Sequence, residues 1–158
     1  NDNSVITALA PATYVDDATG AIVDAPDGAG LYVYPRDPLD ATPVKARVAD
    51  ADAPYVLFQI GEAAQILSGG TLLATPHAVK RGGTMTPSAN NISRDAFALF
   101  VEPHWDYPLA PPPDVPLDAV FGPTDDARSD VVPPLRRRLP HVPVEFAQFL
   151  ADSVAEYY

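Results

Sequence analysis

Short apolar runs recur along the first two thirds of the chain, and glycine, proline or polar residues separate them. β-Branched and aromatic residues are frequent in these runs, and residues 44–48 alternate apolar and charged side chains as a half-buried strand does. The pattern predicts strands at 5–9, 31–34, 44–48, 55–60, 71–79 and 97–101. Residues 14–30 and 80–91 are predicted as loops, with a hairpin near 18–20. Many short strands with turns between them are typical of an antiparallel sandwich or jelly roll.

Helical signals occur in two places. Residues 62–67 predict a brief helix, which the glycines of residues 68–70 end. Residues 144–158 predict an amphipathic helix, because their apolar side chains are spaced for one helical face, at Phe146, Phe149, Leu150 and Val154. The sequence therefore predicts a mainly β protein that ends in a helix.

Proline is abundant between the strands and the last helix. The chain has 19 prolines, and proline lacks the amide hydrogen that a helix interior or a central strand needs. We therefore predict three parts: a β core at 1–103, an extended proline-rich tail at 104–143 and a closing helix at 144–158. The basic run at 136–138 within the tail is interpreted as a solvated patch.

Composition and charge narrow the possible partners. The chain of 158 residues has no cysteine, which excludes a disulfide, a thiolate metal site and a cysteine nucleophile in it. Its net charge of -11 repels nucleic acid and anionic lipid, and no apolar run approaches the roughly 20 residues of a membrane span. We expect neither nucleic acid nor membrane as a partner, and a cytoplasmic location.

A few side chains are candidates for chemistry. Asp2 stands at the entrance of the first strand, His77 follows a strand, and Arg94 opens the next one. A neutral imidazole can bind iron, and a guanidinium can pair with a carboxylate through two hydrogen bonds. Taken singly, each also fits a plain interpretation as a solvated carboxylate, a structural histidine or a surface cation. The other histidines, His104 and His141, lie in the proline-rich tail and are interpreted as structural.

These residues stand in segments that together resemble one family, the isopenicillin N synthase-like 2-oxoglutarate/Fe(II)-dependent dioxygenases. Each segment is similar to a family motif, and the set keeps the family's order over nearly the whole chain. The matches are to the end of the His-x-Asp motif at 1–7, the strand-Gly-Asp/Glu-helix-Ser-Asn/Gly-Gly segment at 58–70, the distal histidine at 75–79, the Arg-x-Ser/Thr motif at 94–97 and the closing helix at 145–158.

The resemblance implies a double-stranded β-helix, or jelly roll, incomplete because its N-terminal part is missing. Fe(II) is then expected on Asp2, His77 and a histidine immediately before Asn1. The far carboxylate of 2-oxoglutarate is expected to pair with Arg94. A small organic substrate and O2 are the implied partners, and the sequence indicates no oligomeric state.

Two departures from the family pattern keep alternatives open. The stretch 80–91 lengthens the spacing between the distal histidine and the arginine, and Ala96 replaces a hydroxyl residue. A lost hydrogen bond to a charged group is worth about 1.5–3 kcal/mol. The alternatives are an Fe(II) oxidase of the same fold in which Arg94 binds a substrate carboxylate, a non-catalytic jelly-roll binding module, and a plain acidic β-sandwich.

Overall fold

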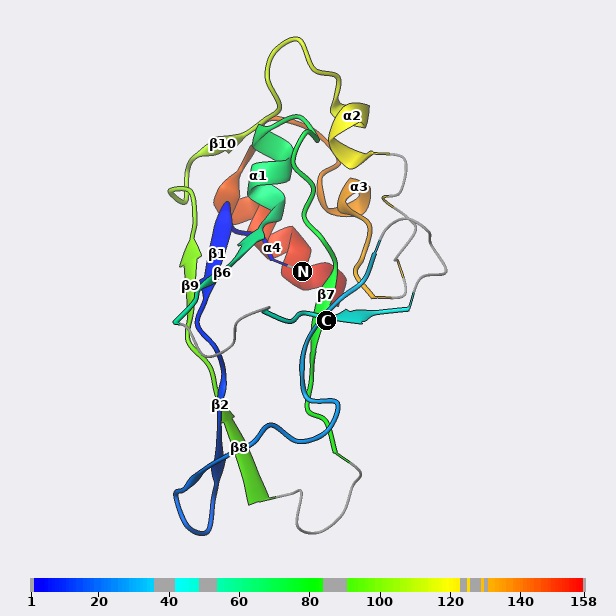
Figure 1. Ribbon diagram of the computed structural model, residues 1–158. Helices are drawn as coiled ribbons and strands as arrows, with labels where there is room; N and C mark the ends of the chain where they lie inside the picture. Colours follow the sequence, from blue (N-terminus) through cyan, green and yellow to red (C-terminus); the bar gives the residue numbers. More distant parts are fainter. Residues whose placement is uncertain are drawn as a thin grey trace.

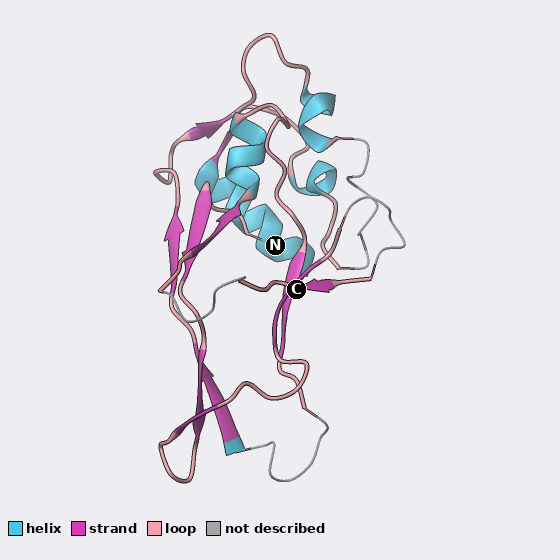
Figure 2. Cartoon of the chain, in the orientation of Figure 1, coloured by secondary structure: helices cyan, strands magenta, loops and turns pink. Residues whose placement is uncertain are grey.

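The computed structural model of the protein describes residues 2–35, 42–48, 54–83, 91–122, 125, 129 and 131–157. The strands are β1 Ile6–Leu9, β2 Thr13–Asp16, β3 Ile22–Val23, β4 Gly30–Val33, β5 Val44–Lys45, β6 Leu57–Ile60, β7 His77–Lys80, β8 Ile92–Asp95, β9 Ala98–Val101, β10 Pro108–Leu109 and β11 Val144–Glu145. The helices are α1 Glu62–Leu67, α2 Leu117–Phe121, α3 Leu135–Arg138 and α4 Phe146–Tyr157. The prediction of a mainly β chain that ends in a helix is confirmed (Figures 1 and 2).

The strands build two walls. The first wall consists of the sheets β6-β1-β9 and β3-β2-β8, and the second is the sheet β5-β4-β7. All their pairings are antiparallel. Figure 1 shows the walls on opposite sides of the molecule, with the helices gathered at one end. No helix in the described ranges is both long and apolar enough to cross a membrane.

A β-bulge joins the two sheets of the first wall. Leu9 pairs with Ala98 and Thr13 pairs with Asp95, so the three residues 10–12 stand opposite the two residues 96–97. Pro11 lies in this bulge, where its missing amide breaks no regular ladder bond. The strand predicted at 97–101 is therefore found as β9, and β8 is a further strand on the other side of the bulge.

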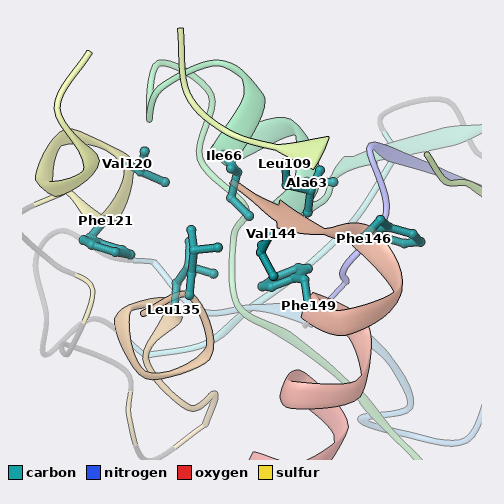
Figure 3. Packing of buried hydrophobic residues seen from close by; sticks show 10 residues of the cluster. Ala63, Ile66, Leu109, Val120, Phe121, Leu135, Val144, Phe146 and Phe149 are labelled. Atoms are coloured by element: carbon teal, nitrogen blue, oxygen red, sulfur yellow. The ribbon is translucent and has the colours of Figure 1, made fainter. Parts of the chain in front are cut away.

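The main hydrophobic core lies at the helical end, and segments far apart in sequence contribute to it (Figure 3). Its buried members are Ala63, Ile66, Leu109, Val120, Phe121, Leu135, Leu139, Val144, Phe146 and Phe149. Half of this set comes from residues 104–143, which the sequence predicts to be an extended tail. That stretch instead contains α2 and α3. Pro116 and Pro134 are compatible with these helices because they immediately precede them, where the first amides need no partner in the helix.

The last helix buries its expected apolar face only in part. Phe146 and Phe149 are almost fully buried, whereas the side chain of Val154 is 51% exposed. The outer face of the sheet β6-β1-β9 is also apolar and open, since Phe58, Leu99 and Val101 are each about half exposed or more. Open apolar faces of this kind are typical of surfaces that contact another element or partner.

A buried ion pair joins three of the helices. The guanidinium of Arg138 at the end of α3 binds both carboxylate oxygens of Glu62 at the start of α1. It also donates to the carbonyl of Pro133, at 2.9 Å from Nη2, and to the hydroxyl of Ser153 on α4, at 3.3 Å from Nη1. Arg138 is therefore no part of a solvated patch, in contrast to the sequence interpretation, while Arg136 and Arg137 are exposed. Burial lowers the pKa of Arg138, but the hydrogen bond and charge of Glu62 outweigh it and raise the pKa overall.

Removing one partner of this pair should destabilise the protein strongly, because the other charge stays buried without compensation. We expect Glu62→Ala to lower the free energy of unfolding by about 3–5 kcal/mol. The double variant Glu62→Leu/Arg138→Leu should lose less than Glu62→Ala, since no charge is left buried. Urea denaturation measures both values, and the exposed Arg137→Ala is the control. Equal losses in Glu62→Ala and Arg137→Ala would contradict a structural role for the pair.

Candidate functional site

A cavity of about 400 Å³ lies between the two walls. From the first wall, Thr7 on β1 stands in register with Gln59 on β6 and Phe100 on β9, and all three line the cavity. From the second wall, Leu31 on β4 and Val79 on β7 are in register and also line it. Since successive residues of a strand alternate between faces, the inner faces of the two walls enclose this space.

The structure brings the three residues singled out from the sequence to this one cavity, which is lined by Asp2, His77 and Arg94. Asp2 precedes β1, His77 is the first residue of β7, and Arg94 lies within β8. Carboxylate, imidazole and guanidinium thus reach the same space from both walls. The other two histidines do not line it.

The carboxylate of Asp2 is buried and held in one orientation. Its Oδ1 accepts the Ser4 amide hydrogen at 2.9 Å, and its Oδ2 accepts the Thr7 hydroxyl hydrogen. The Ser4 and Thr7 hydroxyl oxygens are themselves 3.1 Å apart. A carboxylate oxygen has two lone pairs, so each oxygen of Asp2 retains one for a metal ion.

The backbone around Asp2 is fixed to the start of α1. The amide of Glu62 donates to the carbonyl of Asp2 at 2.7 Å, and the amide of Ala63 donates to that of Ser4 at 3.2 Å. This approach requires a glycine at position 61, because a Cβ on Gly61 would lie 2.0 Å from the carbonyl oxygen of Ser4. The packing of residues 2–5 against the start of α1 therefore sets where the carboxylate stands.

The imidazole of His77 has one nitrogen committed and one available. Nδ1 lies 3.0 Å from the carbonyl oxygen of Thr75. A carbonyl only accepts hydrogen bonds, so Nδ1 carries the proton and Nε2 carries the lone pair, which is the form that binds metals. Among the described residues, Nε2 has no hydrogen-bond partner.

The segment before His77 is also fastened to α1. The side chain of Gln65, which is fully buried, accepts the amide hydrogen of Ala74 at 2.8 Å and donates to the carbonyl of Val120 at 2.8 Å. The sequence predicts a strand throughout 71–79, but the strand begins only at His77. In the stretch before His77, this side chain holds Ala74, and the carbonyl of Pro76 accepts the amide hydrogen of Tyr34 at 2.8 Å.

Arg94 lies directly opposite Tyr14 of β2, and both side chains line the cavity together with Ala96. Tyr14 is buried, whereas Arg94 is exposed and has no hydrogen bond or ion pair with the described residues. The sequence reading missed Tyr14, because it treated 14–30 as a loop. The run Thr13 to Val15 of β-branched and aromatic residues was the signal for this strand.

The chemistry of the donors fits part of a metal site. Asp2 and His77 are one carboxylate and one imidazole, two members of the two-histidine, one-carboxylate set that binds non-haem Fe(II). Within the described ranges, no group of three or more His, Cys, Asp or Glu side chains converges as a metal site. His104 instead pairs with Asp106 at 2.5 Å on the surface, and this hydrogen bond lowers the pKa of Asp106.

No protein-family model and no curated protein matches the chain. Its fold is similar to that of a protein from Caulobacter crescentus assigned to the 2OG-Fe(II) oxygenase family, with a TM-score of 0.53 and 18% identity, over 99% of this chain and 39% of that one. It is also similar to full-length Neurospora crassa T7H, solved in complex with alpha-KG, with a TM-score of 0.53 and 15% identity, over 99% of this chain and 36% of that one.

The chain therefore spans under two fifths of the length of these two structures. At identities of 18% and 15%, the likeness shows a shared fold. This likeness carries no substrate or residue role to the chain, because one fold can hold sites for many functions.

We expect Gly61→Ala to destabilise the protein by about 1–3 kcal/mol or more, because the new methyl group would overlap the carbonyl of Ser4. Gly20→Ala separates this steric effect from backbone strain, since Gly20 has a positive φ of 70° and nothing within 4 Å of its Cβ position. It should cost only about 1 kcal/mol. Urea denaturation compares the two, and a Gly61→Ala loss no larger than that of Gly20→Ala would contradict the close approach of Ser4 to Gly61.

Proposed function

We propose that the chain is the C-terminal part of a non-haem Fe(II)/2-oxoglutarate-dependent oxygenase of the isopenicillin N synthase-like type, which oxidises a small organic substrate with O2. The observation that carries the proposal is the shared cavity of Asp2, His77 and Arg94. These residues come from motifs separated in sequence and from two different walls. The two solved structures of similar fold support it at the level of the fold.

In this proposal the walls are the two sheets of a double-stranded β-helix, and residues 1–103 carry the site. Asp2 and the Nε2 of His77 hold the iron, and the third ligand is assigned to a histidine immediately before Asn1. Fe(II) bound in this way, with 2-oxoglutarate and O2, supplies the oxidation of a C–H bond.

In this proposal the side chains around the cavity bind and orient the metal ion and 2-oxoglutarate. Ser4 and Thr7 keep the carboxylate of Asp2 in one rotamer, and the carbonyl of Thr75 keeps the lone pair of His77 on Nε2. Apolar side chains from both walls line much of the cavity and exclude water from it, among them Leu9, Leu31, Leu57 and Val79. Arg94 pairs with the far carboxylate of 2-oxoglutarate.

One specific observation favours a second candidate. Ala96 lines the cavity beside Arg94 but has no hydroxyl to offer a carboxylate. An Fe(II) oxidase of the same fold, in which Arg94 binds a carboxylate of the substrate, would need no such hydroxyl. The two candidates differ in whether turnover requires 2-oxoglutarate.

Substituting either proposed ligand should remove metal binding. We expect Asp2→Ala and His77→Ala in the full-length protein each to abolish stoichiometric Fe(II) binding, measured under anaerobic conditions, because each removes a donor atom. Metal analysis after gel filtration measures the bound iron, and His104→Ala is the matched histidine control. If both variants retain the wild-type iron content, the metal site lies elsewhere or does not exist, and the binding-module alternative gains support.

Substituting Arg94 should weaken the binding of 2-oxoglutarate without affecting the binding of iron. We expect Arg94→Ala to raise the 2-oxoglutarate concentration needed for half-saturation at least about tenfold, since a charge-assisted pair is lost, while Fe(II) binding stays nearly intact. Arg94→Lys should recover part of this loss, because lysine restores the charge but not the planar fork. Saturation curves decide the point. If the wild-type and Arg94→Ala curves coincide, Arg94 does not bind 2-oxoglutarate.

A further inference from the structure

A second cavity, of about 370 Å³, adjoins the first. Among the residues that the structure describes, Tyr14, Val79 and Arg94 line both cavities. Asp2 and His77 line only the first cavity, and Arg81 lines only the second. Arg94 therefore stands at the junction, with the proposed metal ligands on one side and Arg81 on the other.

The charge of this second cavity is one-sided. Arg81 and Arg94 both line it, and none of its described lining residues is an aspartate or glutamate, although the chain carries a net charge of -11. Neither arginine forms a hydrogen bond or an ion pair with any residue in the described ranges. Two like charges on one cavity repel each other, and an anion between them would relieve this cost.

The backbone beyond Arg81 is anchored. Gly82 has a φ of 73°, and a Cβ there would lie 2.2 Å from the amide nitrogen of Ala29. The amide of Gly83 donates to the carbonyl of Asp27 at 2.6 Å. Arg81 follows β7 directly, and the two-residue period of a strand puts it on the side of Val79, which lines both cavities. The packing of its neighbours thus holds the backbone of Arg81 at the cavity, while its side chain is exposed.

We propose that Arg81 and Arg94 together form a two-arginine site for the far carboxylate of the dicarboxylic 2-oxo acid. This inference rests on the proposed function and adds a residue that determines co-substrate specificity. Arg81 supplies charge-assisted hydrogen bonds where Ala96 offers no hydroxyl. A ligand that extends from Asp2 and His77 past Arg94 brings its far end to Arg81. A 2-oxo acid without a second carboxylate gains nothing from this site.

The test uses glutarate, which has two carboxylates but no keto group and so reports on the arginine site without iron. Ligand-observed NMR with the full-length, metal-free protein measures its affinity. Arg81→Ala, Arg81→Gln and Arg94→Ala should each weaken glutarate binding at least about tenfold, and Arg81→Lys should recover part of the loss. Lys80→Ala is the matched control, because it removes the neighbouring positive charge, which lies over the ring of Tyr32 and lines neither cavity. It should bind as the wild type does.

A second arm compares 2-oxoglutarate with pyruvate on Fe(II)-loaded protein without O2. Arg81→Ala should weaken 2-oxoglutarate and leave pyruvate unchanged. If Arg94→Ala weakens the binding of both glutarate and 2-oxoglutarate, but Arg81→Ala binds them as tightly as Lys80→Ala does, the role of Arg81 is refuted and the proposed function stands. Wild-type protein that binds no glutarate also refutes the two-arginine site, whatever its iron content. Glutarate binding that depends on both arginines, in a protein that takes up no Fe(II), supports the carboxylate site and removes the proposed function.

Discussion

The buried ion pair between Glu62 and Arg138 is the contact on which the site geometry depends. Burying two charges costs several kcal/mol for each ion, and only good geometry with further hydrogen bonds offsets this. The guanidinium has such partners in the carbonyl of Pro133 and the hydroxyl of Ser153. The same Glu62 donates its amide hydrogen to the carbonyl of Asp2. One residue thus fastens the helical core with its side chain and the candidate metal ligand with its backbone.

How far the sequence predicts this structure depends on the range of the interactions involved. Strand β1 and helix α4 follow from the local apolar pattern and helix α1 from the glycines that end it, and the structure has them where they are predicted. Helices α2 and α3 could not be predicted in this way. Their five and four residues are too few to show the apolar periodicity of a helix, and the density of prolines around them favours an extended chain. What forms them is the burial of Phe121 and Leu135 in a core assembled from distant segments.

The same limit applies to individual side chains. The burial of Arg138 depends on a carboxylate 76 residues away in sequence, so a run of three arginines gives no local sign of it. Motif order carries long-range information that composition does not, and it singles out Asp2, His77 and Arg94, which line one cavity in the structure. Arg81 stood in a stretch interpreted as a loop, and only the arrangement of the two walls brings it to a cavity beside Arg94.

A site that draws its donors from two walls needs something to hold the walls at a fixed separation, and α1 does this. Its first residue binds the carbonyl of Asp2, which leads into the first wall. One turn later, Gln65 binds the amide of Ala74, which leads to His77 in the second wall. Residues three apart in a helix lie near one another on its surface. One short, packed helix can therefore hold both the segment that carries Asp2 and the segment that leads to His77. The apolar core around α1 therefore stabilises the fold and also determines whether carboxylate and imidazole face the same cavity.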